Sequence, residues 1–324
     1  MKAIVQDRYG SADVLELGDV DMPVPNDDEV LLRVHAAGVD PGVWHLMTGM
    51  PYLVRILGYG LRRPKVYVRG RDVAGRVEAV GKDVTEFRPG EEVFGIGEGS
   101  FAEYACARAD KLAPKPANLT FEQAAVVPIS ALTALQGVRD RGQVRPGQRV
   151  LVIGAAGGVG TFAVQVAKAF GAEVTGVCST TKADLVRSIG ADHVVDYTRE
   201  DFADGTRHWD LILDTAGNRP LSRLQRALAP KGTLVLVGGE GGGRWLGGFE
   251  RQLFWAPLRS PFVGQKLRSL SSKERKEDLD TLRALIEAGK LTPVIDRTYP
   301  LAEAPEAIRY LAQGHPRGKV AVTV

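Results

Sequence analysis

From Arg149 onward the sequence alternates short apolar runs with amphipathic segments, and this alternation constrains the fold more than any other feature. Runs rich in Val, Ile and Leu of this kind are typical of strands buried on both faces of a parallel sheet that helices cover. Five such runs occupy residues 149–154, 173–179, 193–197, 210–217 and 233–239. Helices are expected between them at residues 159–170, 182–189 and 221–228, and an apolar stretch at 260–264 is a candidate sixth strand. The sequence therefore predicts an α/β fold with a doubly wound parallel sheet of the Rossmann type.

A glycine-rich loop joins the first of these strands to the first helix. Its candidate cofactor-binding residues are Ala155, Gly157, Gly158, Val159 and Gly160. Glycines permit a tight turn and let backbone N–H groups approach a pyrophosphate, while the positive end of the helix points at the same group. Ala155 replaces the first glycine of the usual fingerprint. A turn that binds nothing is the alternative, but the surrounding strands favour a dinucleotide.

The end of the second strand distinguishes NAD from NADP. An NAD site presents Asp or Glu to the ribose 2′-hydroxyl about 20 residues past the loop. Here the residues are Ser179, Thr180, Thr181 and Lys182, without an acid. Hydroxyls and an ammonium group suit a 2′-phosphate, which a carboxylate would repel. NADPH is the predicted cofactor, although Lys182 can also be read as an ordinary exposed lysine.

The first 120 residues have a different character. Short alternating segments broken by Gly and Pro predict strands at residues 29–36, 74–80, 92–95 and 101–105, with turn chemistry at 83–90. Thr120 with Gln123 predicts a helix start, followed by an apolar helix over 124–138. The C-terminal part predicts helices over 273–287 and 304–313 and a strand over 319–324.

Composition excludes several classes of protein. The chain has 324 residues, of which 44% are hydrophobic, and a formal charge of +3. These values argue against disorder and against nucleic acid as a partner. No apolar run approaches about 20 residues, so no membrane association is expected. The N-terminus lacks the features of a signal peptide, and the two cysteines cannot form a disulfide framework. A reducing compartment, most simply the cytoplasm, is expected.

Several motifs in order resemble the medium-chain dehydrogenase/reductase superfamily, in its zinc-independent quinone oxidoreductase-like branch. They are residues 36–49 (AAGVDPGVWHLMTG), 70–81 (GRDVAGRVEAVG), 89–90 (PG), 99–105 (GSFAEYA), 127–134 (VPISALTA), 154–160 (GAAGGVG) and 317–322 (RGKVAV). The resemblance implies a GroES-like, mostly β domain over 1–121, to which 264–324 return, and a Rossmann domain over 122–263. It also implies an active site in the cleft between them and a homodimer.

Zinc-dependent members of that superfamily carry a cysteine after the Ala-Gly-Val segment, a Gly-His-Glu, and a lobe with four cysteines. This chain has Asp40 at or near the first position and Gly70-Arg71-Asp72 at the second, and no cysteine precedes Cys106. His45 and Asp72 alone cannot supply the three or four ligands that zinc needs. The sequence predicts no metal.

Without a metal to polarise a carbonyl, hydride transfer is limited to substrates that are already electrophilic, namely quinones and α,β-unsaturated carbonyls. The candidate catalytic residues are Asp40, His45 and Tyr52. Similar reductases have Asn where Asp40 stands and Tyr near His45, so both roles are in doubt. An imidazole can donate a proton to an enolate, but His45 can equally pack or hydrogen-bond locally. Tyr52 can orient a carbonyl or be an ordinary amphipathic tyrosine.

The resemblance also places other residues near the cofactor. Thr133 corresponds to a threonine at the nicotinamide ribose or amide, Tyr197 to a tyrosine near the 2′-phosphate, and Gly238 and Gly239 to backbone that passes the nicotinamide. Arg71 and Asp72 are read as a structural pair. Five aromatic residues can line an apolar substrate pocket or a dimer interface: Trp245, Phe249, Phe254, Trp255 and Phe262.

Three other functions can be compared with the sequence. A short-chain reductase needs Tyr-x-x-x-Lys, and none of the eight tyrosines has lysine four residues on. A non-catalytic NADPH-binding redox sensor stays open because Asp40 and His45 depart from the family pattern. A zinc-type alcohol dehydrogenase is the third possibility.

Overall fold

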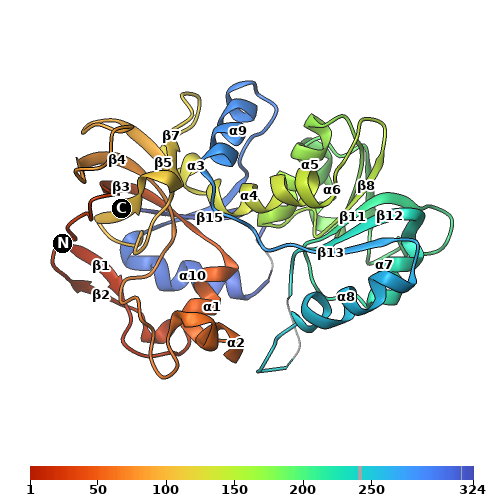
Figure 1. Cartoon of the computed structure of the whole chain (residues 1–324), viewed down its shortest axis with the longest axis horizontal. Coiled ribbons are helices and arrows are strands. Elements are labelled where there is room, and N and C mark those ends of the chain that lie inside the picture. Colours follow the sequence, from red (N-terminus) through yellow and green to blue (C-terminus); the bar gives the residue numbers. More distant parts are fainter. Residues whose placement is uncertain (240–242, 315) are drawn as a thin grey trace. The chain divides into compact units, whose positions relative to one another are not determined.

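The computed structural model describes residues 1–239, 243–314 and 316–324, and the chain forms two compact units (Figure 1). The first comprises residues 1–132, 274–287 and 293–324, and the second comprises 133–273 and 288–292. The division differs from the predicted boundaries at 121 and 264. The first unit keeps the helix after Thr120, and the chain returns to it at Glu274.

The first unit is built mainly on antiparallel sheets. A seven-stranded sheet has the order β14-β15-β3-β4-β5-β7, with β6 also paired to β3. Its strands are β3 (Glu29–Val39), β4 (Asp72–Val80), β5 (Glu92–Ile96), β6 (Tyr104–Arg108), β7 (Leu112–Pro114), β14 (Ile295–Pro300) and β15 (Lys319–Thr323). Two further strands, β1 (Lys2–Val5) and β2 (Glu16–Asp19), pair with each other. The predicted strand over 101–105 was misplaced, since β6 starts at Tyr104, and β14 was missed.

Strand β3 is the central element of this sheet. Val30, Leu32 and Val34 are buried on one face, whereas Arg33 between them is exposed, as alternation requires. Strands β4, β6 and β15 all pair with β3 in antiparallel register. The far end of β3 therefore lies inside a sheet that is paired on both sides.

Helices of the first unit follow capping and proline signals. They are α1 (Pro41–Thr48), α2 (Tyr52–Val54), α3 (Phe121–Ala125), α9 (Lys276–Glu287) and α10 (Ala304–Ala312). The predicted cap is confirmed, because Thr120 Oγ1 accepts from the N–H of Gln123 at 3.3 Å and Gln123 Oε1 accepts from the N–H of Thr120 at 3.0 Å. The single helix predicted over 124–138 was wrong: α3 ends at Ala125, and α4 (Pro128–Gln136) begins at a proline, which lacks the N–H needed inside a helix.

The second unit is a doubly wound sheet, as predicted. Six parallel strands have the order β10-β9-β8-β11-β12-β13. They are β8 (Arg149–Ile153), β9 (Glu173–Cys178), β10 (His193–Asp196), β11 (Trp209–Asp214), β12 (Leu228–Leu236) and β13 (Lys266–Ser269). Helices α5 (Gly158–Ala169) and α6 (Ala183–Ser188) cover one face, and α7 (Leu221–Ala227) and α8 (Ala256–Arg259) cover the other (Figure 1). The strand order reverses between β8 and β11.

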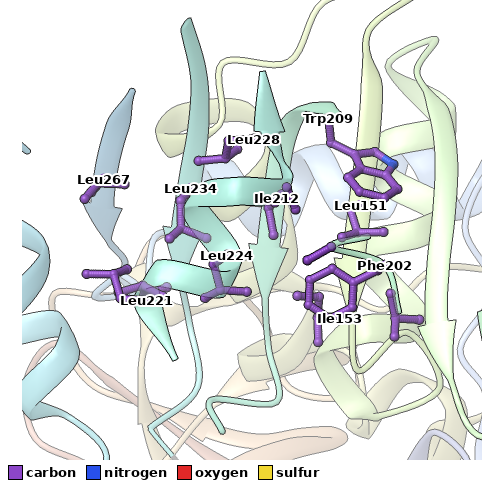
Figure 2. Packing of buried hydrophobic residues seen from close by; sticks show 14 of the residues in the cluster. Leu151, Ile153, Phe202, Trp209, Ile212, Leu221, Leu224, Leu228, Leu234 and Leu267 are labelled. Carbon is purple, nitrogen blue, oxygen red and sulfur yellow. The ribbon is translucent and has the colours of Figure 1, made fainter. Parts of the chain in front are cut away.

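Apolar side chains from neighbouring strands fill the core of the second unit. Figure 2 shows Leu151, Ile212 and Leu234, from three adjacent strands, beside Leu224 of α7 and Trp209. Each of these is at most 3% exposed, so replacing any one of them by alanine leaves a cavity that costs about 2–5 kcal/mol.

The sixth strand exists but lies later in the chain than predicted. Residues Ser260–Phe262 form a 3₁₀ turn, and β13 begins at Lys266. Pro261 cannot donate to a strand ladder, and Phe262 is 84% exposed, so this apolar stretch does not join the sheet.

An ion-pair cluster links the segment just before α9 to residues that precede β4 and β7. Arg71 Nη2 donates to Glu274 Oε1, and Lys111 Nζ lies 2.8 Å from Glu274 Oε2. Glu274 is 22% exposed as a side chain. Burial raises the pKa of its carboxyl, but Arg71 and Lys111 outweigh that effect and hold it below the ordinary value.

Replacement of Glu274 by glutamine should destabilise the protein by about 1–2 kcal/mol at neutral pH, because it leaves two cations without their counter-charge. Because the pKa of Glu274 is lower in the folded state than in the unfolded state, its carboxylate stabilises the folded protein at pH values above the unfolded-state pKa. This stabilisation is lost as the pH falls through the folded-state pKa. The variant should therefore lose part of the acid dependence of urea unfolding. Glu287→Gln, in the more exposed pair with Arg283 on the same helix, is the control and should cost about 0.5 kcal/mol or less.

Candidate functional site

The predicted cofactor-binding residues of the second unit lie at one edge of its sheet. Because all six strands are parallel, the segments that follow β8, β9, β10 and β12 emerge at the same edge. These segments hold the glycine loop, the 179–182 turn, Tyr197 and the pair Gly238–Gly239. Their convergence at the reversal of strand order is the arrangement in which open α/β sheets bind ligands.

The glycine loop is packed so tightly that two of its positions, 154 and 160, disfavour any residue with a side chain. Gly154 has φ +81°, a left-handed conformation that favours glycine. Gly157 N–H donates to Gly154 O at 2.9 Å. A Cβ on Gly160 would lie 2.0 Å from Gly154 O, whereas one on Gly157 would come no closer than 3.3 Å. Gly160 therefore packs helix against strand, and Gly157 lies at the half-exposed rim.

The start of α5 presents backbone donors at that rim. Gly157 is the N-cap, and the first intrahelical bond runs from Thr161 N–H to Gly157 O at 2.9 Å. The N–H groups of Gly158, Val159 and Gly160 precede that bond and have no partner within the helix. Ala155 is fully buried, with its N–H bonded to Val177 O at 3.1 Å. This cradle fits a pyrophosphate, with Gly157–Val159 as its accessible part.

The turn after β9 carries hydroxyls, as predicted, but it also has an acidic neighbour. Thr180 Oγ1 donates to Asp196 Oδ2, and Thr198 Oγ1 donates to Asp196 Oδ1 at 2.7 Å. Asp196 ends β10 and pairs in register with Cys178. Sequence reasoning missed it because the carboxylate comes from the next strand, although the β9–β10 order was inferable. Hydrogen bonds from Thr180 and Thr198 hold the pKa of Asp196 below its ordinary value.

Tyr197 lies beside the same turn. Its N–H donates to Cys178 O at 3.1 Å, and its side chain is 49% exposed. The guanidinium of Arg219 lies 5.4 Å from the centroid of its ring, within cation–π range. The structure thus brings Tyr197 and residues 179–182 together, with Lys182 half-buried and Thr180 and Thr181 exposed.

The glycines after β12 are shaped by their neighbours. A Cβ on Gly238 would lie 2.4 Å from Thr215 O, and one on Gly239 would lie 2.9 Å from the ring of Phe249. Thr133 is half-buried on α4, at the start of the second unit. Four of the five aromatic residues predicted to line a pocket or an interface are at least half exposed: Trp245, Phe254, Trp255 and Phe262. The fifth, Phe249, is half-buried.

The candidate catalytic residues of the first unit follow one another after β3. Asp40 is the N-cap of α1, and its Oδ1 accepts from Gly42 N–H at 2.6 Å. The residue is 3% exposed, and Oδ2 is buried without a hydrogen-bond partner. An Asp directly before Pro41 is a recognisable helix-start signal. Asp40 thus has a structural role in addition to any chemical one.

His45 and Tyr52 are oriented by their own contacts. His45 Nδ1 lies 2.6 Å from Met50 O, and since a carbonyl only accepts, Nδ1 carries the proton of this bond. Trp44 contacts the imidazole edge-on, with ring centroids 5.1 Å apart. The guanidinium of Arg55 lies 4.9 Å from the Tyr52 ring centroid. His45 therefore makes the local hydrogen bond that the sequence left open, with Met50 O as the acceptor. This bond directs Nε2 away from Met50.

The expected pairing of Arg71 with Asp72 was wrong. Arg71 pairs with Glu274, whereas Asp72 accepts from the N–H of Ile129 at 2.9 Å and lies 3.6 Å from Lys319 Nζ. Adjacent residues at the start of β4 point to opposite sides, so they have different partners. Asp72 is fully buried and Lys319 is 2% exposed. Burial raises the pKa of the Asp72 carboxyl to about 7, although Lys319 lowers it.

In zinc-dependent members of the superfamily, the positions of Asp40 and of residues 70–72 carry zinc ligands. The residues that this chain has there do not fit that metal. Among residues 1–239, 243–314 and 316–324, no group of three or more His, Cys, Asp or Glu side chains is placed to hold a metal ion. The second position is occupied by the Arg71 guanidinium, and the buried Lys319 ammonium lies beside Asp72. Both fixed cations would repel a divalent ion. Burial raises the pKa of the Cys106 and Cys178 thiols to about 11, which disfavours the thiolate that zinc binds.

Known proteins resemble this chain in both of its units. Residues 26–117 match the family described as "Alcohol dehydrogenase GroES-like domain", and residues 189–322 match the family described as "Zinc-binding dehydrogenase". Over its whole length the chain is 35% identical to the mitochondrial NAD(P)H oxidoreductase RTN4IP1 of Mus musculus, covering 89% of that protein. The chain belongs to the medium-chain dehydrogenase/reductase superfamily, in its quinone oxidoreductase-like branch.

Other members give the same result. The human quinone oxidoreductase is 32% identical, with 97% of this chain and 94% of that protein covered. The solved quinone oxidoreductase of Coxiella burnetii has a TM-score of 0.86 at 30% identity, covering 100% of this chain and 99% of the other. A mycobacterial protein solved in complex with NADPH has a TM-score of 0.83 at 27% identity, covering 100% of both chains.

These comparisons leave location open. The mouse relative is named as mitochondrial, and the cytoplasmic location expected above stays a prediction. Among the residues the structure describes, no helix has the length and apolar character needed to cross a bilayer.

Two glycine substitutions should separate folding from cofactor binding. Gly160→Ala should lower the free energy of unfolding by about 2–3 kcal/mol, because its Cβ would overlap Gly154 O. Gly157→Ala should unfold like the wild type but bind NADPH at least about 10-fold more weakly, because the cofactor's pyrophosphate would lose close backbone approach. Thermal unfolding and a fluorescence titration with NADPH measure the two effects. Unchanged NADPH affinity in Gly157→Ala would remove the glycine loop from the site.

Proposed function

We propose that this protein is an NADPH-dependent reductase that transfers hydride to a quinone or an α,β-unsaturated carbonyl without a metal. The observation that carries the proposal is the donor-rich edge of the parallel sheet. There the amide cradle of α5 adjoins the hydroxyls and Lys182 of the turn after β9. A pyrophosphate and a 2′-phosphate are the groups such donors suit.

Each candidate residue has a defined part in binding. Gly157, Gly158 and Val159 would hold the pyrophosphate, and Lys182 and Tyr197 would hold the 2′-phosphate. Asp196 adds a negative charge, but its oxygens already accept from Thr180 and Thr198, and Arg199 lies 3.9 Å away. The bound nicotinamide supplies hydride. The names of the relatives, NAD(P)H oxidoreductase and quinone oxidoreductase, support the same class of reaction.

The substrate class follows from what the first unit offers. Arg71 pairs with Glu274, and Lys319 lies beside Asp72. Cations near these positions disfavour a divalent ion, and a substrate that is reduced without a Lewis acid has to be electrophilic already. His45, held through Nδ1, can donate from Nε2 when protonated, and the phenol of Tyr52 can orient a carbonyl. A homodimer in the cytoplasm, with no nucleic acid and no membrane partner, completes the proposal.

Charge-changing variants should alter the choice of cofactor. Lys182→Ala should weaken NADPH binding about 10-fold or more, through loss of a charge-assisted bond, and leave NADH binding unchanged. Asp196→Asn should strengthen NADPH binding a few-fold by removing a nearby negative charge. Isothermal titration of both cofactors tests this, with the exposed Lys231→Ala as control. Equal loss of NADH and NADPH affinity in Lys182→Ala would contradict a 2′-phosphate role.

A panel of quinones and enones tests the reaction itself. NADPH oxidation should proceed with members of the panel and persist after dialysis against a chelator. The alternative is a non-catalytic NADPH sensor, in which Asp40 and His45 have no role beyond their local contacts. Such a protein would bind NADPH without turnover, and loss of activity on chelation would instead favour a zinc enzyme.

A further inference from the structure

The first unit holds an arginine that is buried without a counter-ion. Arg69 is 4% exposed, and its Nε and Nη2 atoms are buried without a hydrogen-bond partner. Burial lowers the pKa of Arg69 to about 10, while Tyr9 and the exposed Glu98 oppose that effect, so the guanidinium stays charged at neutral pH. A buried charge is normally paired, and the part of the chain that the structure describes supplies no ion pair for this one.

A second unpaired polar atom lies on the same face as the Arg69 side chain. Val5 and Val68 form an antiparallel bridge, so the residues on either side of them, Gln6 and Arg69 included, point to the opposite face. Gln6 Nε2 donates to Met47 O at 2.6 Å and to one further backbone carbonyl, which fixes the amide. Gln6 Oε1 is buried without a partner. This face therefore offers guanidinium donors together with an amide acceptor.

A second guanidinium acts at the same place. The Arg55 Cζ atom lies 4.3 Å from the centroid of the Tyr9 ring. Burial raises the pKa of the Tyr9 phenol, and the charges of Arg55 and Arg69 both oppose that rise. Arg55 donates to two backbone carbonyls, those of Thr48 and Gly49, and it has no ion pair within the described residues. Two positive charges without a paired carboxylate therefore meet at one phenol.

We propose that Arg69, Arg55 and Gln6 form a binding site for phosphate, either as the free inorganic ion or as the phosphate group of an ester. The planar guanidinium fork matches an oxyanion, and two unpaired positive charges favour an anion with two negative charges. Hydrogen phosphate also carries an O–H group, which can donate to Gln6 Oε1. Sulfate has the same shape and charge but lacks that donor. The site lies within the first unit, so it does not depend on the proposed function.

A small solute can reach this buried site because the segment that contacts Tyr9 is weakly anchored. Its two helical turns, α2 and residues Arg55–Tyr59, contain no buried residue. The Tyr9 hydroxyl holds the end of the segment by donating to Gly60 O at 2.6 Å. Segments that bury little apolar surface open at low cost, so local opening here gives phosphate a path to Arg69.

Isothermal titration of the full wild-type chain tests the ligand class, at neutral pH and constant ionic strength. Inorganic phosphate should bind saturably, and sulfate should bind at least about 10-fold more weakly, because it leaves Gln6 Oε1 unpaired. Glycerol phosphate distinguishes the two sources: tighter binding than the free ion indicates an ester, and weaker binding indicates inorganic phosphate. Equal affinity for sulfate and phosphate would contradict the part assigned to Gln6 and with it the ligand.

A pair of variants locates the site. Phosphate also suits the amide cradle of α5 in the second unit, but binding there would survive a change at Arg69. Arg69→Met should weaken phosphate binding at least about 10-fold through loss of charge-assisted hydrogen bonds. Arg62→Met, which removes an exposed cation close by in the sequence, is the matched control and should stay within about 2-fold. Similar losses in both variants would indicate diffuse attraction, and unchanged affinity in Arg69→Met would remove the site from the first unit.

Thermal unfolding gives a readout of opposite sign. Without phosphate, Arg69→Met should raise Tm by about 2 °C or more, because it removes a buried charge that has no partner. Added phosphate should raise Tm of the wild type and have little effect on the variant. A lower Tm of Arg69→Met in phosphate-free buffer would show that the protein itself pairs this arginine and would overturn the proposal.

Arg69→Lys serves as the second variant if Arg69→Met does not fold. It keeps the positive charge but lacks the planar fork, and it should bind phosphate at least about 3-fold more weakly than the wild type. Wild-type affinity in Arg69→Lys would contradict recognition by the guanidinium.

Discussion

The contact between Gly160 and the carbonyl of Gly154 sets the geometry on which the second unit depends. A side-chain carbon at residue 160 would lie 2.0 Å from that oxygen, so α5 can lie this close to β8 only with glycine there. The close contact aims the first N–H groups of α5 at the carboxyl edge of the sheet. Strand β8 is buried on both faces, which leaves this edge as the place where its chain can meet a ligand. The proposed cofactor site therefore follows from how strand and helix pack.

The first unit has a corresponding constraint at the end of β3. Gly38 leaves room for the buried carboxyl of Asp72, and Asp40 and Lys319 flank the next register pair. Two cations lie beside carboxylates in this unit, Arg71 next to Glu274 and Lys319 next to Asp72. The proposed reduction without a Lewis acid limits the substrate to quinones and α,β-unsaturated carbonyls.

Much of the architecture was predictable because it depends on local patterns. Continuous apolar runs indicated the parallel strands, and Thr120 with Gln123 indicated the start of α3. Other features depended on contacts between distant residues. Asp196 approaches Thr180 only through the pairing of β10 with β9, and Asp72 meets Lys319 only because β4 and β15 flank β3. Prolines explain two errors, since Pro128 separates α3 from α4 and Pro261 keeps residues 260–264 out of the sheet. The roles of Asp40, His45 and Tyr52 stay predictions.

The central claim is that the cofactor reacts and is not merely held. NADPH carrying deuterium at the transferred position of nicotinamide C4 tests this most directly, with the product of an enone reaction analysed by mass spectrometry and NMR. The account predicts one deuterium at the β-carbon and, at the α-carbon, hydrogen from solvent. Tight NADPH binding with no deuterium in any product would contradict it and would identify the protein as a binder.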